Sequence, residues 1–469
     1  MKRYWWVWIL CLFVLAVASC APPKAQTVKT VSIPPGEVDP AVWGKAYPLE
    51  YDSFMKTKEG GQGQSKYKGS DPKDKLSEFP YQLVLLDGWG FGVEFNEPRG
   101  HVNMLKDQLD IDPSRRKAGG VCLTCKTPYA TQLKDKMGVD YYKLPYDQVH
   151  AQIPEEHADL GLSCIDCHDS ATMDLQISRW FLNDALKATG KDPDHLTRQE
   201  KRSLVCAQCH NTYSIVKDQD MKSVGIYLPW QNSKWGNITI ENIEAQYKTD
   251  PSVLEWKNAP TGIKLAQVRH PEFELYSNSS IHWNSGVSCA DCHMPYERAG
   301  SSKISSHHVQ SPLKEDMKAC LQCHNQSPQW LREQVIAIQD RTNNMATRAG
   351  NQTAQAAKAI ELANKTTGVD QQMLNDAKSL YEKAYYRVDF VTAENSMGFH
   401  NPPEAMRVLG DGLYYADRSL AKAREALIKA GVPVPDKFDL ELGKYAKRGS
   451  KGVPFQPELN MEFTFDGIK

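Results

Sequence analysis

The sequence predicts a mainly α-helical protein with long C-terminal helices and little β-strand. From about Ser327 to Ala430, apolar residues recur at i, i+3 and i+4, the spacing of one helix face. Before that region, repeated Cys-x-x-Cys motifs favour short helices and loops over long regular elements. The 469 residues are 41% hydrophobic and 24% charged, which is an ordinary globular balance.

The C-terminal region, 330–430, divides into three helical segments. Gly368 ends the first segment, and Asp370 can cap the second. His400 and the two prolines that follow it break the second segment from a third over 404–430. An apolar stripe of this length predicts a buried core or a subunit interface.

The N-terminus predicts a targeting segment. Residues 1–19 have a basic start and an apolar stretch too short for an ordinary membrane span. The sequence VASC ends at Cys20 and resembles a lipobox, which is cut before a cysteine that is then lipidated. Ordinary signal cleavage or an uncleaved anchor are the alternatives. Residues 20–40 are expected to be a tether, so that the chain is exported to the periplasm and held at the membrane through Cys20.

Residues 41–329 carry the cysteine motifs, and the tail, 431–469, is expected to be extended after Pro435. The formal net charge is −1 and the pI is about 6.9. Without a basic patch, the composition argues against nucleic-acid binding.

Apart from one cysteine in the signal and Cys20, every cysteine belongs to a Cys-x-x-Cys pair. The pairs are Cys122/Cys125, Cys164/Cys167, Cys206/Cys209, Cys289/Cys292 and Cys320/Cys323. Disulfides suit an exported protein, but such short loops would join nothing distant. Structural zinc would group the pairs two by two, and five is an odd number. Four pairs are followed at once by histidine, which favours c-type haem attachment through both thiols.

The histidines can supply axial ligands to haem iron. His168, His210, His293 and His324 complete the four CxxCH motifs and are the predicted proximal ligands. An iron that only carries electrons takes two axial ligands, so four further histidines are needed from the nine that remain. Their positions favour His101, His282, His307 and His400, while His308 competes with His307.

The first pair is followed by Lys126 in place of histidine. A lysine amine can bind iron once it has lost its proton, and an apolar pocket favours that loss. A haem with this unusual ligand is a candidate reaction centre with an open opposite face. The alternative is a degenerate haem site that takes its ligand from a distant residue.

As a set, these motifs resemble the ammonia-forming pentahaem cytochrome c nitrite reductases. One CxxCK precedes four CxxCH, and the similarity continues in EFNEPRGH (94–101), CAQCHNTY (206–213), VRHPEFE (268–274), HWNSGVSCADCHMP (282–295) and RVLG (407–410). The resemblance implies a multihaem cytochrome c fold with five covalently bound haem c groups. It also implies six-electron reduction of nitrite to ammonium at the Lys126 haem.

The resemblance places Arg99, Tyr213 and His270 on the open face of that haem. Arg99 would hold the anionic substrate, Tyr213 would donate a proton or steer a radical, and His270 would polarise nitrite and relay protons. The alternatives are a propionate partner for Arg99, a core aromatic for Tyr213 and a haem ligand for His270. The implied axial pairs are His168 with His307, His210 with His101, His293 with His400, and His324 with His282.

The sequence departs from the family at a calcium site beside the catalytic haem. Most members have Glu before the active-site tyrosine and Lys-x-Gln before the active-site histidine. Here Thr212 replaces the carboxylate, and the segment before His270 ends in Arg269. Calcium prefers oxygen ligands, so we expect no calcium at this position and the Arg269 guanidinium in its place. In the alternative, Arg269 points to solvent and calcium binds elsewhere.

Two other functions compete with nitrite reduction: a multihaem electron-transfer cytochrome without a substrate, and a reductase of sulfite, hydroxylamine or nitric oxide. The expected electron donor is a membrane quinol dehydrogenase cytochrome or a soluble cytochrome. The long helices are expected to form a homodimer interface.

Overall fold

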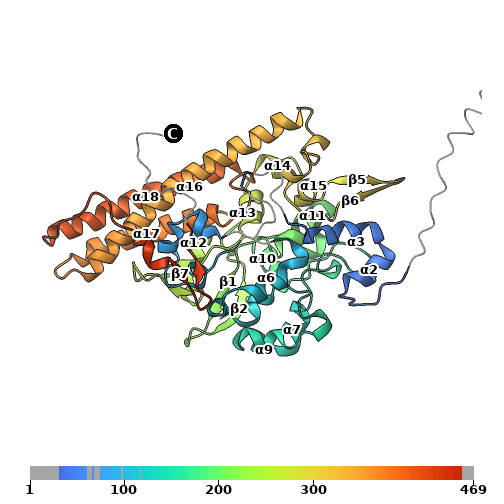
Figure 1. The fold of residues 1–469 in the computed structure, drawn as a ribbon, viewed down its shortest axis with the longest axis horizontal. Helices are drawn as coiled ribbons and strands as arrows, with labels where there is room; N and C mark the ends of the chain where they lie inside the picture. Colours follow the sequence, from blue (N-terminus) through green and yellow to red (C-terminus); the bar gives the residue numbers. More distant parts are fainter. Residues whose placement is uncertain (1–30, 61–65, 68–73, 97–98, 117, 457–469) are drawn as a thin grey trace, which may run out of the picture.

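The computed structural model describes residues 31–60, 66–67, 74–96, 99–116 and 118–456. It is 53% helical with little strand, which confirms the predicted fold class. Figure 1 shows a bundle of three long helices extending along one side of a body of short helices and loops. The predicted signal, residues 1–19, and Cys20 lie outside the described residues. Within the described part of the chain, no helix is both long enough and apolar enough to span a membrane.

The bundle consists of α16 (Pro328–Lys365), α17 (Gln371–Thr392) and α18 (Pro402–Lys429). The Ser327 side chain caps α16 by accepting a hydrogen bond from Trp330 N, and Asp370 caps α17 in the same way. Helix α18 begins at Pro402, two residues before the predicted start, because proline is favoured at the first helical position.

The body contains fourteen short α-helices in the described residues. They are α2 (Pro40–Ala46), α3 (Pro48–Met55), α4 (Lys75–Glu78), α5 (Gln82–Leu85), α6 (Met104–Asp110), α7 (Ala130–Met137), α8 (Asp140–Lys143), α9 (Tyr146–His150), α10 (Trp180–Ala188), α11 (Arg198–Ala207), α12 (Ile240–Thr249), α13 (Glu272–Ser277), α14 (Ile281–Asn284) and α15 (Cys289–His293).

The strands of the described residues form four separate antiparallel pairs. They are β1 (Ser214–Lys217) with β2 (Ser223–Tyr227), β3 (Trp256–Lys257) with β4 (Lys264–Leu265), β5 (Tyr296–Ala299) with β6 (Ser302–Ser305), and β7 (Lys447–Arg448) with β8 (Val453–Pro454). Because no pair joins another, these hairpins shape loops and do not build a sheet core.

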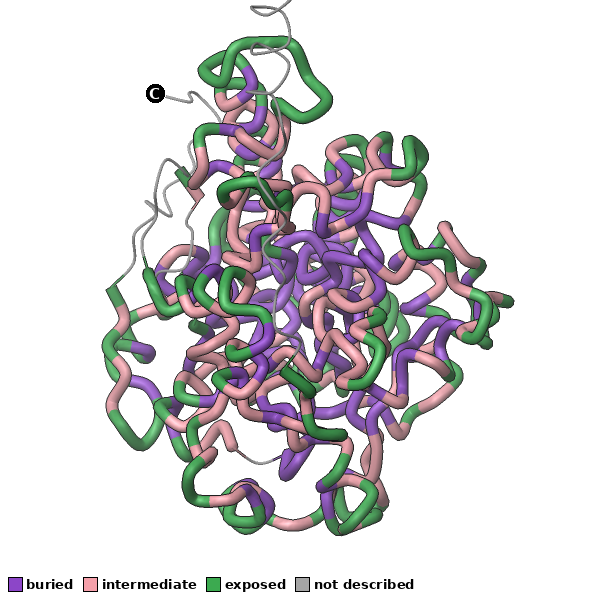
Figure 2. Tube along the Cα trace, turned by 90° about the vertical axis from the view of Figure 1, so that its right-hand side faces the viewer, coloured by how far each residue is buried: buried purple, intermediate pink, exposed green. Residues whose placement is uncertain are grey.

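The bundle and the body share one hydrophobic core. Buried tyrosines of α17, among them Tyr381, Tyr385 and Tyr386, belong to the same cluster as Leu83 of α5 and Trp256 of β3. Figure 2 shows the buried positions gathered in the middle of the molecule and the exposed ones at its rim. The long helices therefore pack directly against the body and share its core.

The tail is not extended throughout, contrary to expectation. Residues 442–445 form a 3-10 helix, and β7 and β8 form a hairpin that returns to the body. Arg448, 4% exposed, pairs with Asp74 at 2.6 Å, and Asp112 accepts a hydrogen bond from Lys451 N at 2.7 Å. Sequence reasoning missed this docking because its partners lie hundreds of residues away.

Asp389 of α17 is a buried acid whose pKa gives a testable pH dependence. Burial raises its pKa from 3.8 to about 7, although Val268 N and Tyr385 Oη each donate to it at 3.1 Å. Between these values the folded protein keeps a proton that the unfolded chain releases, so stability falls as pH rises from about 4 to 7. The free energy of unfolding of Asp389→Asn, relative to that of the wild type, should therefore rise as pH increases over that range and stay constant above it.

Thermal unfolding of both proteins at pH 5 and pH 8 measures this difference. A stability difference between wild type and Asp389→Asn that is the same at both pH values would contradict the prediction.

Candidate haem-binding and active site

One cavity of about 2450 Å³ connects all the predicted haem sites. Its lining includes all ten cysteines of the CxxC motifs, and each of these cysteines is free in the structure. The cavity is larger than an ordinary small-ligand pocket of about 300–1,000 Å³. No three His, Cys, Asp or Glu side chains group as a metal site within the described ranges. Neither the disulfide nor the zinc alternative has support in this arrangement.

Two of the CxxCH motifs share the same local hydrogen-bonding arrangement. In SCIDCH, Ser163 and Asp166 form a capping box around the turn that carries both cysteines. In SCADCH, Ser288 and Asp291 repeat it at the start of α15. Each aspartate also meets an arginine: Asp166 with the buried Arg179 at 2.7 Å, and Asp291 with Arg202 at 2.6 Å. The repeated Ser-Cys-x-Asp-Cys-His pattern was a signal that sequence reasoning missed.

The structure brings together the four histidine pairs that the resemblance implies. The ring centroids are 6.2 Å apart for His168–His307 and His293–His400, 6.4 Å for His282–His324, and 6.5 Å for His101–His210. Two imidazoles bonded at about 2 Å on opposite sides of one metal ion have centroids roughly 6 Å apart. The spacing therefore fits an iron between each pair, and the neighbouring cysteines fit the porphyrin attachment. His308 lies outside these pairs, with Nδ1 at 3.1 Å from Gln310 Nε2.

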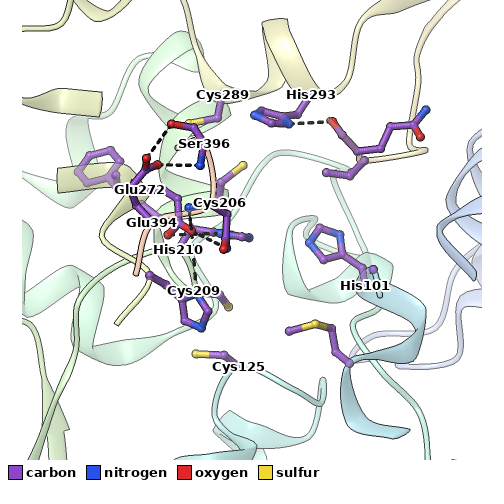
Figure 3. Close-up of a pocket in the computed structure, with 18 of the residues that line it drawn as sticks. His101, Cys125, Cys206, Cys209, His210, Glu272, Cys289, His293, Glu394 and Ser396 are labelled. Atoms are coloured by element: carbon purple, nitrogen blue, oxygen red, sulfur yellow. Dashed lines mark hydrogen bonds and ion pairs between the residues drawn. The ribbon is translucent and has the colours of Figure 1, made fainter. Parts of the chain in front are cut away.

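Lys126 follows the 3-10 turn at 119–123 and also lines the cavity. Burial lowers the pKa of its ammonium, which favours the neutral amine that an iron ligand requires. Figure 3 shows Cys125, beside this lysine, close to Cys209 of the third motif. The lysine site is thus next to the site of His210.

His270 is held in a strained conformation on the cavity wall. Its φ of +44° is unusual for a residue with a side chain. The preceding backbone is fixed, because Val268 N donates to Asp389 and Arg269 N donates to Thr212 Oγ1 at 3.0 Å. Burial lowers the pKa of His270 to about 3, which keeps the imidazole neutral. A neutral ring can accept a proton at one nitrogen and donate one at the other.

The position of His270 also fits the alternative prediction, in which His270 ligates a haem iron. Its ring centroid is 6.4 Å from that of His210, close to the 6.5 Å between His210 and His101. Glu272 lies between the two, with carboxylate oxygens 3.9 Å from His270 Nδ1 and 3.8 Å from His210 Nδ1.

Arg99 and Tyr213 line the same cavity. The Arg99 guanidinium pairs with Asp107 of α6, with Nε at 2.7 Å from the carboxylate. Its side chain keeps 30% exposure, so one face remains accessible. The Tyr213 ring lies 4.8 Å from the Arg269 guanidinium, and burial raises the pKa of its hydroxyl. Tyr213 therefore stays protonated and able to donate.

Arg269 points inward, and its side chain is 3% exposed. One terminal nitrogen donates to Glu255 at 2.9 Å, to Tyr213 O at 3.2 Å and to Gln267 O at 3.3 Å, and the other donates to the second Glu255 oxygen. The Glu255 side chain has no exposure. Sequence reasoning missed Glu255, because one carboxylate among 57 acidic residues carries no mark of its partner.

The fold and the cavity define a multihaem c-type cytochrome in which one attachment site lacks its histidine. The chain belongs to the cytochrome c552 family, whose model matches residues 39–462. This confirms, at the level of the class, the predicted oxidoreductase of the cytochrome c nitrite reductase kind with covalently bound haem c.

Relatives resemble the chain over most of its length. Cytochrome c-552 of Bacteroides fragilis is 34% identical over 90% of this chain and 86% of its own. The cytochrome c nitrite reductase subunit NrfA of Nitratidesulfovibrio vulgaris is 31% identical over 83% of this chain and 79% of its own. A solved nitrite reductase catalytic subunit from Desulfovibrio desulfuricans, described with two calcium sites, has a TM-score of 0.78. It is 31% identical and covers 86% of this chain and 90% of its own.

Proposed function

We propose that this protein reduces nitrite to ammonium at a haem attached to Cys122 and Cys125 and ligated by Lys126. The observation that carries the proposal is that the five attachment sites share a cavity in which one of them has lysine, and that Arg99, Tyr213 and His270 line the same cavity. The reaction consumes six electrons and eight protons per nitrite and releases two waters. When bound, the haem supplies the iron that binds the nitrogen and the electrons that reduce it.

The side chains supply binding and protons. Arg99 would orient the anion by charge-assisted hydrogen bonds from the guanidinium face that Asp107 leaves free. His270, neutral in the folded protein, would take up and release protons at its ring nitrogens as the nitrogen–oxygen bonds break. Tyr213 would donate from its protonated hydroxyl. Glu272, with a carboxylate oxygen 3.9 Å from His270 Nδ1, would place negative charge beside the ring.

Close contacts between the motifs support an electron relay through four bis-histidine haems. Arg179 donates through Nε to Thr124 O of the first motif at 2.6 Å and through its backbone N to the Gln208 side chain of the third motif at 3.2 Å. Ser203, on the helix that carries Cys206, accepts a hydrogen bond from Cys289 N at 3.3 Å. These contacts favour a relay in which the His210 site adjoins both the lysine site and the His293 site.

We infer that the Arg269–Glu255 pair replaces calcium in this chain. The guanidinium binds the backbone oxygens of Tyr213 and Gln267, which are the kind of oxygen that a calcium ion would take. Thr212 has no carboxylate. Its hydroxyl oxygen instead accepts a hydrogen bond from Arg269 N. Positive charge is thereby kept beside Tyr213.

The proposal extends to assembly and location. Met406, Tyr414 and Ile428 expose apolar side chains along α18, which supports a homodimer through the long helices. We propose residues 41–329 as the pentahaem catalytic region and 330–430 as that interface. The chain is proposed to be periplasmic and tethered at Cys20, with electrons from a membrane quinol dehydrogenase cytochrome or a soluble cytochrome.

Steady-state turnover with a reduced dye donor tests the function, with ammonium measured as the product. Ammonium formed in proportion to the nitrite consumed supports it, and nitrite converted to a gas overturns it. The optical spectrum distinguishes the electron-transfer alternative: a high-spin component that responds to nitrite or cyanide favours the enzyme, whereas an entirely low-spin spectrum favours a carrier.

Calcium removal is expected to leave nitrite reduction and thermal stability unchanged, because Arg269 already occupies the backbone oxygens. The assay is turnover and metal analysis before and after treatment with a calcium chelator. The matched variant Thr212→Glu/Arg269→Gln should become calcium-dependent, since it restores a carboxylate and an amide oxygen. Stoichiometric calcium in the wild type, with activity lost on chelation, would contradict this inference.

A further inference from the structure

Glu394 is a buried carboxylate in the loop between α17 and α18. Its side chain has no solvent exposure, and both of its oxygens accept hydrogen bonds. Oε2 accepts from Ser396 N at 2.8 Å and from His400 Nδ1 at 3.1 Å. Oε1 accepts from Ser396 Oγ at 3.0 Å and from Gly398 N. Each carboxylate oxygen thus has two hydrogen-bond partners, and the His400 ring is one of the four.

This partner sets His400 apart from other histidines of the cavity. His168, His293 and His307 each donate Nδ1 to a backbone carbonyl, at 2.9, 2.8 and 2.9 Å respectively. His210 Nδ1 lies 3.8 Å from Glu272, beyond hydrogen-bond distance. Among the described histidines of the cavity wall, His400 is the one with a hydrogen bond to a carboxylate.

The loop holds the carboxylate in place. Ser396 Oγ also accepts from His400 N at 2.8 Å, so the serine links the carboxylate to the backbone of the histidine. Gln339 of α16 donates to Ser396 O at 3.0 Å. Gly398 has a φ of +78°, and a Cβ there would collide with Thr342 of α16. Glu394 therefore cannot turn away from the ring without rearranging the loop.

A carboxylate acts on a ligating histidine more strongly than a carbonyl does. It draws the Nδ1 proton toward itself, which makes the other nitrogen a stronger electron donor to the metal. It also brings a buried negative charge close to the metal. Both effects stabilise the ferric ion over the ferrous ion, and so they lower the reduction potential.

We propose that Glu394 is a positioning residue that orients His400 and lowers the reduction potential of the haem held by His293 and His400. This inference rests on the haem ligation in the proposed function. In the relay, electrons that move between the His210 haem and the His324 haem would pass through this haem, whose reduction potential is lowered. The step is a one-electron exchange between ferric and ferrous iron and needs no further reactant.

The test is Glu394→Gln in the holoprotein, with midpoint potentials of individual haems measured by potentiometric titration followed by electron paramagnetic resonance. The side chain keeps its shape and one acceptor oxygen but loses its charge. We expect a roughly tenfold loss of preference for ferric iron in one low-spin haem, which is an upward shift of about 59 mV for a one-electron couple. Unchanged potentials in all the low-spin haems would overturn the proposal.

Ser396→Ala is the matched control, because it removes a donor to Glu394 and the acceptor of His400 N but leaves the carboxylate on the His400 ring. A much smaller shift than that of Glu394→Gln supports the role of the charge, and an equal shift assigns the effect to loop geometry and overturns it.

If Glu394→Gln fails to mature, the electron paramagnetic resonance spectrum of the wild type decides. One low-spin ferric signal with a narrower g spread than the others supports the carboxylate, and four alike refute it. If the wild type makes no ammonium but Glu394→Gln still shifts the midpoint potential of one haem, only the proposed reaction is refuted.

Discussion

Replacing Arg269 with alanine is expected to lower the free energy of unfolding by about 3–5 kcal/mol. The variant leaves the Glu255 carboxylate, which has no exposure, without its charge partner. It also removes the donor to the carbonyls of Tyr213 and Gln267. Because Tyr213 lies against the guanidinium, nitrite turnover should fall together with stability. Denaturant unfolding and turnover measure both effects.

Arg407→Ala is the control for this variant. Arg407 also pairs with acids, Glu404 and Glu241, but its side chain is 42% exposed, and exposed ion pairs contribute only about 0–1 kcal/mol. Arg269→Ala/Glu255→Ala should recover part of the loss, because it no longer buries an unpaired charge. An Arg269→Ala protein as stable as Arg407→Ala would show that the pair is unimportant.

Replacing His270 with asparagine is expected to reduce nitrite turnover by about 10²- to 10⁴-fold, the usual contribution of a proton-transfer residue. Haem content and the low-spin spectrum should stay as in the wild type, because His270 is not an iron ligand in the proposed scheme. Turnover with a dye donor, pyridine haemochrome analysis and optical spectra provide the three measurements.

His308→Asn is the matched control, because His308 belongs to none of the four pairs and contacts Gln310. It should turn over at the wild-type rate. If His270→Asn instead loses one low-spin signal, then His270 ligates iron beside His210, which is the reading that their 6.4 Å ring separation leaves possible.

The parts of the fold that sequence predicts are those with local causes. Ser327 and Asp370 cap their helices as polar residues at such positions do, and the prolines after His400 start α18. The CxxC motifs are visible because both thiols and the next side chain come from one turn. The docked tail, Glu255 and Glu394 were missed, since each depends on a partner that no local pattern specifies.

Within the site, the resemblance supplied the identity of the histidine pairs, and the structure supplied their spacing. The sequence predicts an inward Arg269 bonded to backbone carbonyls or to a carboxylate, but it does not identify Glu255 as that carboxylate. The missing carboxylate at Thr212 and the cation at Arg269 together predict that calcium is absent. Where the carboxylate partner of Arg269 lies depends on how the segment before β3 packs beside the active-site segment, and this is a tertiary property.

The histidine pairs carry a consequence for the order in which the protein matures. A CxxCH motif offers both thiols and one ligand within a single turn, so it can receive its haem in an unfolded chain. The second histidine comes from a distant segment, such as His101 for His210 or His307 for His168. Attached haems would then act as anchors that each capture a remote part of the chain, and closing those long loops becomes favourable only after attachment. Haem attachment would thus precede folding, and a missing haem would leave two distant segments unjoined.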